Sequence, residues 1–279
     1  MLRRMKIAAL LPTLFSDLAR GAIESLLTAL APFERAEVVV VSPNPVEGPR
    51  VKWVPERESR GVTRAQNAAL AATDADIVLA ASDDIRARPD SIEKAIRFLL
   101  ANEPPAAPYI VGFNAIHPGK CPYGVIGTAY GHYYPYFPLV RRRTIGVVGF
   151  YDTAYTSFWG DVDMALRAWT TPGGRCEMSP GCFDLLPDGE GRAEAPAKSQ
   201  NIWRDMAVFQ ARWADTVGQG WGREMKDFNI DLRPHEPLDQ GLDRDAVAHL
   251  QAELRDAVRT GRMRAPENAP ELGPPKVVG

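Results

Sequence analysis

Short apolar stretches alternate with segments of helical periodicity over the first hundred residues, and this alternation constrains the fold more than any other feature. The stretches that we expect to form strands cover residues 7–11, 37–41, 51–54 and 76–81. The segments that we expect to form helices cover residues 18–30, 62–72 and 92–100. Strands joined by helical crossovers lie parallel in one sheet. The sequence therefore predicts an α/β fold with a single Rossmann-like sheet, mixed but mostly parallel, flanked by helices.

The second half of the chain has a different texture. Residues 109–138 are rich in Gly, Tyr and Pro and show no helical period, which predicts short strands and loops. Helical patterns return at 161–169 and 202–213, and a last amphipathic one covers 247–258. We therefore expect a region of short strands and loops, followed by helical segments.

Composition and charge are those of an ordinary soluble protein. The 279 residues carry a formal net charge of −2 with the basic residues spread along the chain, so nothing argues for broad nucleic-acid binding. A nucleic-acid acceptor held by local contacts stays open. The three cysteines are too few for a disulfide framework, which indicates a reducing compartment. No apolar run approaches the roughly 20 residues that span a bilayer, so we expect a cytoplasmic protein, with peripheral membrane attachment left open.

Two adjacent carboxylates, Asp83 and Asp84, follow the predicted strand at 76–81 directly. Ligands of parallel sheets bind beyond the carboxyl ends of the strands, and hard cations prefer carboxylate oxygens. The pair can therefore hold Mg²⁺ or Mn²⁺, with Asp84 as the first candidate for direct ligation, and so neutralise a leaving diphosphate. The alternative is that the two residues form a plain turn before a helix.

A second acidic motif opens the helix predicted at 161–169. Asp161 can act as a general base that takes the proton from an acceptor hydroxyl. Trp159 can stack on an acceptor sugar, and Asp163 and Tyr133 are further candidates for acceptor contacts. The alternatives are that the two aspartates only stabilise the helix start and that the aromatic side chains pack in the core.

Basic residues near the helix predicted at 62–72 are candidates for phosphate contacts. Arg60 and Arg64 can bind a diphosphate, although a solvated helix face explains them equally well. The sequence contains no Walker loop and no G-x-G-x-x-G fingerprint, so those two classes of nucleotide-binding protein lose support.

In their order and spacing, these motifs resemble the family 2 glycosyltransferases, which have the GT-A fold. The likeness covers about residues 5–215, and the segments that show it are 6–13, 61–70, 82–90, 146–152, 158–167 and 203–213. The resemblance implies a metal-dependent, inverting transfer of a sugar from a nucleoside-diphosphate sugar to an acceptor hydroxyl. Asp161 would be the general base, and Asp83 and Asp84 would hold Mn²⁺ or Mg²⁺.

The resemblance also implies where the substrates bind and how the chain is divided. The residues expected at the donor site are Pro12, Thr13, Ser42, Arg64, Asn67, Ser82 and Asp83. The GT-A domain, 1–215, would have a nucleotide-binding half at about 1–105 and an acceptor-binding half at about 106–215. A helical extension at 216–262 and a flexible tail at 263–279 would follow. The acceptor stays open between a glycan, a lipid-linked glycan and another hydroxyl compound.

Three positions depart from the family pattern. Ser42 stands where many members have an aspartate that binds the nucleobase, which leaves the donor base open. Gly160 stands where they have a glutamate before the catalytic aspartate. Asp184 lies where many have a histidine, and we expect it to replace that residue as a metal ligand.

Two other functions are compatible with the motifs. A nucleotidyltransferase of similar fold also uses carboxylates at strand ends, but it usually needs a glycine-rich basic loop where residues 12–15 read Pro-Thr-Leu-Phe. A degenerate, non-catalytic protein that binds glycans or acts as a scaffold would fit Ser42 and Gly160. The retained acidic residues argue against it, because adjacent carboxylates without a role repel each other.

Overall fold

The computed structural model describes residues 4–117, 121–129, 132–186, 201, 203–213 and 229–233. The elements of the first half are β1 (Lys6–Pro12), α1 (Ser16–Ala29), β2 (Arg35–Ser42), β3 (Val51–Pro55), α2 (Val62–Ala71), β4 (Ile77–Ala80), β5 (Ile85–Ala87) and α3 (Ser91–Asn102). Those that follow are β6 (Tyr109–His117), β7 (Cys121–Ala129), β8 (His132–Tyr134), β9 (Leu139–Arg141), α4 (Arg142–Val148), α5 (Gly160–Thr170), β10 (Arg175–Leu185) and β11 (Asn229–Arg233). A further helix covers residues 203–213.

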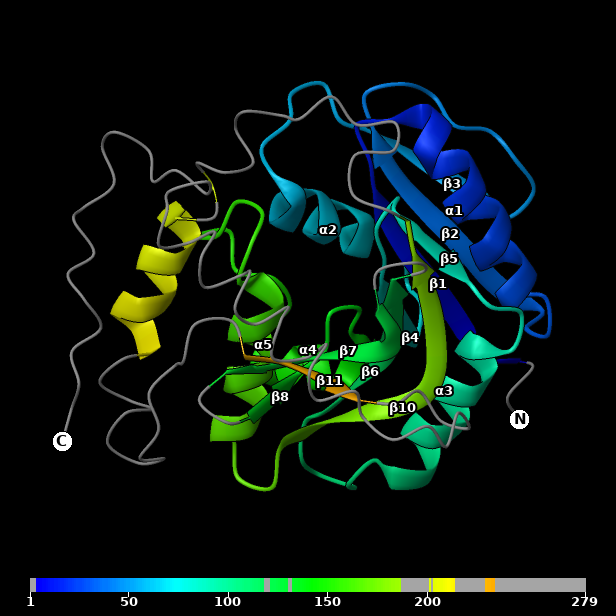
Figure 1. The fold of residues 1–279 in the computed structure, drawn as a ribbon. Helices are drawn as coiled ribbons and strands as arrows, with labels where there is room; N and C mark the ends of the chain where they lie inside the picture. The colour runs from blue at the N-terminus through cyan, green and yellow to red at the C-terminus, as the bar shows by residue number, and fades with distance from the viewer. Residues whose placement is uncertain are drawn as a thin grey trace, which may run out of the picture.

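One mixed sheet runs through the described part of the chain in the order β11-β7-β6-β9-β4-β1-β2-β3, with β10, β5 and β8 attached beside this path (Figure 1). Its first half is parallel, as predicted: β1 pairs with β2 and β4, and β2 pairs with β3. The second half adds the antiparallel pairings. Here β9 lies between β4 and β6 and is antiparallel to both, so it joins the two halves into one sheet.

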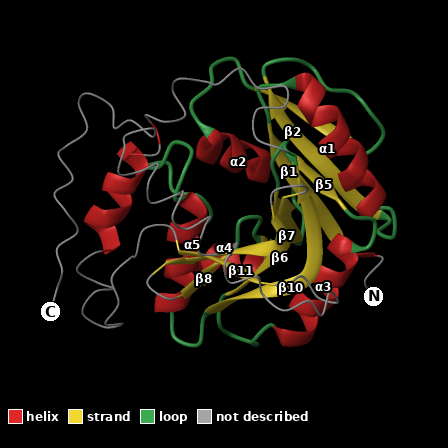
Figure 2. Ribbon diagram, viewed as in Figure 1, coloured by secondary structure: helices red, strands yellow, loops and turns green. Residues whose placement is uncertain are grey.

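Helices cover both faces of the sheet, as the alternation predicts. In Figure 2, α1 and α3 lie on one side of the strands, and α2 and α5 lie on the other. Strand β1 shows the reason, since Ile7, Ala9 and Leu11 belong to the core beneath α1 and α3, whereas Ala8 and Leu10 belong to the core beneath α2 and α5. All five are 0% exposed, and a strand buried on both faces needs a helical layer on each.

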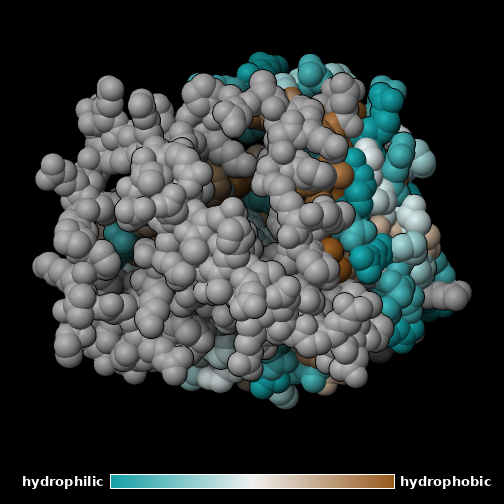
Figure 3. All heavy atoms as spheres, viewed as in Figure 1, coloured by the Kyte–Doolittle hydropathy of each residue, from teal (hydrophilic) through white to brown (hydrophobic). Residues whose placement is uncertain are grey.

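The outer faces of the helices are polar. On α1 the exposed positions include Arg20, Glu24 and Thr28, and hydrophilic side chains gather on that side of the molecule in Figure 3. None of the helices in the described ranges is both long and apolar enough to cross a bilayer. Cys176 and Cys182 are buried free thiols.

The C-terminal part differs from the expectation in one place. Within the helical extension expected at 216–262, residues 229–233 form β11, which pairs antiparallel with β7 at the edge of the main sheet. The sequence Asn-Ile-Asp-Leu-Arg alternates polar and apolar residues, a strand pattern. The amphipathic pattern at 247–258 and the tail at 263–279 lie outside the described residues.

Candidate functional site

The first acidic motif lies where β1 and β4 end side by side. These strands are parallel neighbours, so the residues that follow them meet. The Thr13 hydroxyl donates a 2.7 Å hydrogen bond to Oδ2 of Asp83, and both residues are buried. The Ser82 hydroxyl donates to Asp84, whose backbone carbonyl accepts from the Leu186 amide at 2.8 Å. The structure thus brings together the loop after β1, the acidic motif and the end of β10.

The donor set at this edge fits a divalent cation that is shared with a substrate. Asp83 and Asp84 offer carboxylate oxygens, and Mg²⁺ in such sites is commonly held by one or two carboxylates with phosphate and water as the other ligands. Within the described ranges, no three His, Cys, Asp or Glu side chains are grouped so as to hold a metal by themselves. The residues present therefore fit a metal that binds together with a diphosphate.

Asp184, which we expected as a further metal ligand, is engaged elsewhere. Both of its carboxylate oxygens accept hydrogen bonds from Arg88, the shortest at 2.8 Å. Strand β10 pairs antiparallel with β5 and places Asp184 opposite Arg86. The structure therefore does not bring Asp184 into a metal site with Asp83 and Asp84, because the Arg88 guanidinium already neutralises it.

The corner after β2 and β3 is built around Ser42. Its hydroxyl donates to the carbonyl of Asn44 at 2.7 Å, and its own carbonyl accepts from the Trp53 indole at 3.2 Å and from the Glu56 amide at 3.0 Å. Glu56 thereby brings an acidic side chain to the corner where the family pattern has an aspartate. Burial raises the pKa of that carboxyl. The sequence did not point to Glu56, because this residue follows β3 and the family pattern has its aspartate after β2.

Helix α2 connects the first acidic motif to the second. Toward the first, the Gln66 side-chain amide donates to the carbonyl of Ala81 at 2.9 Å, directly before Ser82. Toward the second, the Asn67 side-chain amide donates to the carbonyl of Tyr151 at 2.8 Å. Asn67, expected at the donor site, therefore holds the backbone of the segment that precedes the second acidic motif.

The start of α2 is fixed to the same part of the chain. The Thr63 hydroxyl donates to the carbonyl of Tyr155, and the Thr63 amide donates to the carbonyl of Thr156 at 3.3 Å. Gly61 has φ +96° and lies so close that a Cβ there would approach the Thr156 carbonyl to 2.3 Å, so this contact requires glycine. Arg64, the expected diphosphate ligand, is exposed on the same helix.

Asp161 lies in the first turn of α5 in a largely desolvated place. Its carboxylate accepts from the Val162 amide at 2.9 Å, and burial raises its pKa from 3.8 to about 7. Its charge in turn raises the pKa of three tyrosines around it, Tyr134, Tyr136 and Tyr151, after the larger effect of their own burial. A carboxyl that is half ionised near neutral pH is suited to general base catalysis.

Gly160 has no room for the glutamate of the family pattern. A Cβ at this position would come within 2.7 Å of the Tyr151 ring and 3.1 Å of the Thr63 side chain. Tyr151 thus fills the space beside Asp161 that a side chain at 160 would need. The sequence reasoning missed Tyr151, although its place within the 146–152 segment was a usable signal.

Asp163 does not face an acceptor site. Its carboxylate is 0% exposed and accepts hydrogen bonds from Tyr155 (3.0 Å) and from Arg167, Arg212 and Trp213 (2.9 Å each). An acceptor cannot reach this buried carboxylate, whose Oδ1 accepts from three donors and whose Oδ2 accepts from Arg167. The expectation of acceptor contacts at Asp163 is therefore replaced by a structural role, in which it ties α5 to the 203–213 helix.

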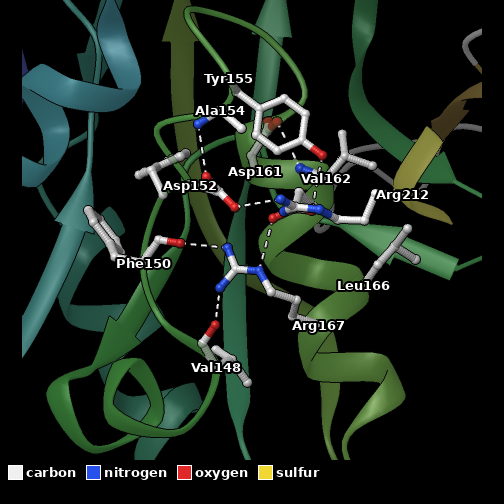
Figure 4. A network of polar contacts seen from close by, with 12 residues as sticks. Val148, Phe150, Asp152, Ala154, Tyr155, Asp161, Val162, Leu166, Arg167 and Arg212 are labelled. Carbon is white, nitrogen blue, oxygen red and sulfur yellow. Dashed lines mark hydrogen bonds and ion pairs between the residues drawn. The ribbon is translucent and has the colours of Figure 1, made fainter. Parts of the chain in front are cut away.

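The arginines of this network extend it to the chain before α5. Figure 4 shows Arg167 donating to the carbonyls of Val148 and Phe150, and Arg212 donating to Asp152. The Ala154 amide, and then Arg212, hold the pKa of Asp152 below its ordinary value. Hydrogen bonds from these two arginines thus hold the segment from Val148 to Asp152, which leads toward Asp161.

The two aromatic residues expected at the acceptor site pack with the hydrophobic core, Trp159 as a buried member and Tyr133 as a partly buried neighbour. Trp159 is 6% exposed, and its ring lies 4.9 Å from that of Phe209. The Tyr133 hydroxyl lies against Gly112, where a Cβ would come within 2.0 Å of it. These positions agree with the alternative of core packing, and an acceptor contact by either residue remains a prediction.

Comparisons by sequence gave no match, either to protein-family models or to curated proteins. Comparisons of structure did. A mannosyltransferase from Pyrobaculum calidifontis, PcManGT, in complex with GDP-Man and Mn²⁺, is 16% identical with a TM-score of 0.53, over 95% of this chain and 77% of that one. S. aureus TarS is 13% identical with a TM-score of 0.51, over 77% of this chain and 46% of that one. The chain has the GT-A fold that the sequence resemblance implies.

Proposed function

We propose that this protein is a metal-dependent glycosyltransferase that moves a sugar from a nucleoside-diphosphate sugar to an acceptor hydroxyl. The observation that carries the proposal is the Asp161 carboxyl, with a pKa of about 7. Hydrogen bonds from α2 connect the segment before it to the carboxylate pair after β4, Asp83 and Asp84. One group suits a general base and the other suits a cation shared with a diphosphate. The GDP-Man and Mn²⁺ bound by PcManGT, which has the same fold, support this assignment.

The donor would bind at the carboxyl ends of β1, β2 and β4. Asp84, with Asp83, would hold Mn²⁺ or Mg²⁺, and such an ion neutralises the charge that develops on a leaving nucleoside diphosphate. Thr13 fixes the orientation of Asp83 through its 2.7 Å hydrogen bond. Arg64, exposed on α2, would bind the diphosphate. The remaining donor-site residues of the proposal are Pro12, Ser42, Asn67 and Ser82.

Asp161 would act on the acceptor. As the acceptor oxygen forms its bond to the anomeric carbon, its proton passes to the Asp161 carboxylate and the bond from that carbon to the diphosphate oxygen breaks. A single displacement of this kind inverts the anomeric centre. Burial helps because it makes the carboxylate more basic than an exposed aspartate. The acceptor would be a glycan, a lipid-linked glycan or another hydroxyl compound, and the buried free thiols fit a reducing compartment such as the cytoplasm.

A donor panel tests the proposal. Thermal unfolding is measured with each nucleoside diphosphate and its sugars, with and without Mn²⁺, for the wild type and for Asp84→Ala. We expect stabilisation that needs both the metal and one nucleotide and that Asp84→Ala abolishes. Asp161→Asn should keep this stabilisation and lose transfer, measured as release of the nucleoside diphosphate.

Three outcomes would contradict the proposal or a part of it. Release of pyrophosphate in place of a nucleoside diphosphate would indicate a nucleotidyltransferase. Glycan binding without any metal-dependent nucleotide binding would indicate a non-catalytic protein. Full transfer activity in Asp161→Asn would show that Asp161 is not the general base.

A further inference from the structure

The carboxylate of Asp205 is bound by consecutive backbone amides from a distant part of the chain. It accepts from Thr156 at 2.9 and 3.0 Å, from Ser157 at 2.7 Å and from Phe158 at 2.8 Å. Asp205 is 0% exposed. A buried carboxylate is costly unless it is hydrogen bonded, and here backbone N–H groups meet that need. The geometry resembles the amide concavities that proteins use to bind anions.

The segment that Asp205 holds leads directly into the proposed base. Residues 156–158 are followed by Trp159, which is in the left-handed region with φ 65°, then by Gly160 and Asp161 at the start of α5. This conformation is unfavourable for a tryptophan and persists only where the surroundings impose it. The turn that sets the direction of α5 therefore depends on contacts from outside it.

Those contacts come from one face of the 203–213 helix. Asp205 binds the 156–158 amides, Phe209 packs on Trp159, and Arg212 and Trp213 donate to Asp163. Positions four, seven and eight residues after Asp205 lie on its side of a helix. The chain on both sides of Asp161 is thus fixed to the same helical face.

We propose that Asp205 is a positioning residue for Asp161: its carboxylate holds the backbone of 156–158 and so fixes the turn through Trp159 from which Asp161 enters α5. The inference rests on the proposed function for the role of Asp161. A carboxylate can accept all of these hydrogen bonds at once. An asparagine has one accepting oxygen and turns an N–H₂ group toward at least one backbone amide. Asp205→Asn therefore loosens the segment while changing the volume of the side chain little.

The first test follows the titration of Asp161 and does not need enzyme activity. The carboxyl carbon of Asp161 is observed by ¹³C NMR across pH and assigned with Asp161→Asn. In Asp205→Asn we expect the titration midpoint to fall by about one pH unit from its wild-type value, because the loosened segment lets more water reach this partly buried carboxyl. Glu103→Gln is the matched control: the Glu103 side chain is also buried (4% exposed) and pairs with Arg141 and Arg143. It should leave the midpoint unchanged.

A kinetic test follows if the wild type transfers sugar. Asp205→Asn should lower kcat by about tenfold, because a base that is slightly displaced loses part of its contribution to the rate. The KM for the donor should be unchanged. The acidic limb of the pH profile should move to lower pH. Glu103→Gln should show neither effect. An unchanged midpoint and acidic limb in folded Asp205→Asn would overturn the inference.

The outcomes separate the inference from the proposed function. If the midpoint moves and the wild type shows no transfer, the positioning role stands and the proposed function fails. If Asp161→Asn abolishes transfer and Asp205→Asn behaves as the wild type, only the positioning role fails. Should Asp205→Asn not fold, hydrogen exchange of the wild type decides. The amides of Thr156, Ser157 and Phe158 should exchange as slowly as the amides of β1. Rapid exchange of these three amides would overturn the inference.

Discussion

The hydroxyl of Thr13 donates a 2.7 Å hydrogen bond to Oδ2 of Asp83, across the ends of two parallel strands that are 70 residues apart in the sequence. The same hydroxyl accepts from the Phe15 amide at 3.0 Å. One buried oxygen therefore determines both the course of the loop after β1 and the orientation of an acidic side chain at the proposed metal site.

Replacing Thr13 tests this relationship. Thr13→Val keeps the shape of the side chain and removes the hydroxyl, so the buried Asp83 carboxylate loses a donor. We expect a loss of about 1–3 kcal/mol in the free energy of unfolding and weaker metal-dependent stabilisation by nucleotide. Thr13→Ser keeps the hydroxyl and should restore most of both. Equal nucleotide and metal binding in Thr13→Val and wild type would show that this hydrogen bond does not organise the site.

Asp161 should make the protein less stable at neutral pH than at acidic pH. Its folded-state pKa, about 7, lies above its ordinary value of 3.8, so within this window the native state holds a proton that the unfolded state has lost. Stability therefore falls as pH rises from about 4 to 7. Asp161→Asn cannot ionise and should be more stable than wild type by about 2 kcal/mol at pH 8, with a smaller difference at pH 4. Urea unfolding at both pH values measures this.

The same residue predicts the pH dependence of transfer. Activity of the wild type should rise with a midpoint at about pH 7, as Asp161 loses its proton, whereas Asp161→Asn should be slower by about 10²-fold or more. The measurement covers about pH 5 to 8, which is roughly two pH units below the expected midpoint and one above it. Wild-type activity that does not change over this range would argue against Asp161 as the base.

Asp163 should matter for stability more than its neighbour Asp152, although both bind Arg212. Asp163→Asn leaves Arg167 and Arg212 facing a buried neutral group and should cost about 3–5 kcal/mol. Asp152 is 35% exposed, and Asp152→Asn should cost less than about 1 kcal/mol. Chemical denaturation compares the two. If Asp163→Asn is as stable as the wild type and only its affinity for the acceptor falls, Asp163 contacts the acceptor and does not have the structural role described for it.

Gly160 and Tyr151 should be coupled. Gly160→Ala places a methyl group within 2.7 Å of the Tyr151 ring and should destabilise the protein by about 1–3 kcal/mol through overpacking. Tyr151→Leu alone removes the obstacle, and the double variant should recover part of the loss caused by Gly160→Ala. A double-mutant cycle measures the coupling, and strictly additive effects would contradict the steric explanation.

The sequence predicted the first half of the fold well because its strands are continuous apolar runs and its helices have clear periods. It did not indicate β10, since Pro180 and Gly181 interrupt the strand and a register shift lies between Met178 and Cys182. That strand depends on pairing with β6 and β5, which local sequence does not encode.

The candidate site shows a similar limit. Asp161 and Asp163 are two residues apart and therefore point about 200° apart around α5. One faces a group of tyrosines, and the other faces the 203–213 helix. The sequence identified both as acidic residues at a helix start, but their different environments come from chain segments that are remote in sequence.

The insertion of β9 between β4 and β6 bears on how the protein is made. The outer edge of β4 is paired by Leu139–Arg141, about sixty residues further along the chain. During synthesis the first half of the chain therefore emerges from the ribosome with one edge of β4 unpaired, and pairing between segments so far apart in the sequence is slow. An unpaired apolar edge is a template for aggregation. A fragment that ends near residue 105 should accordingly associate or engage chaperones, and the two acidic motifs should reach their final positions in a single folding step.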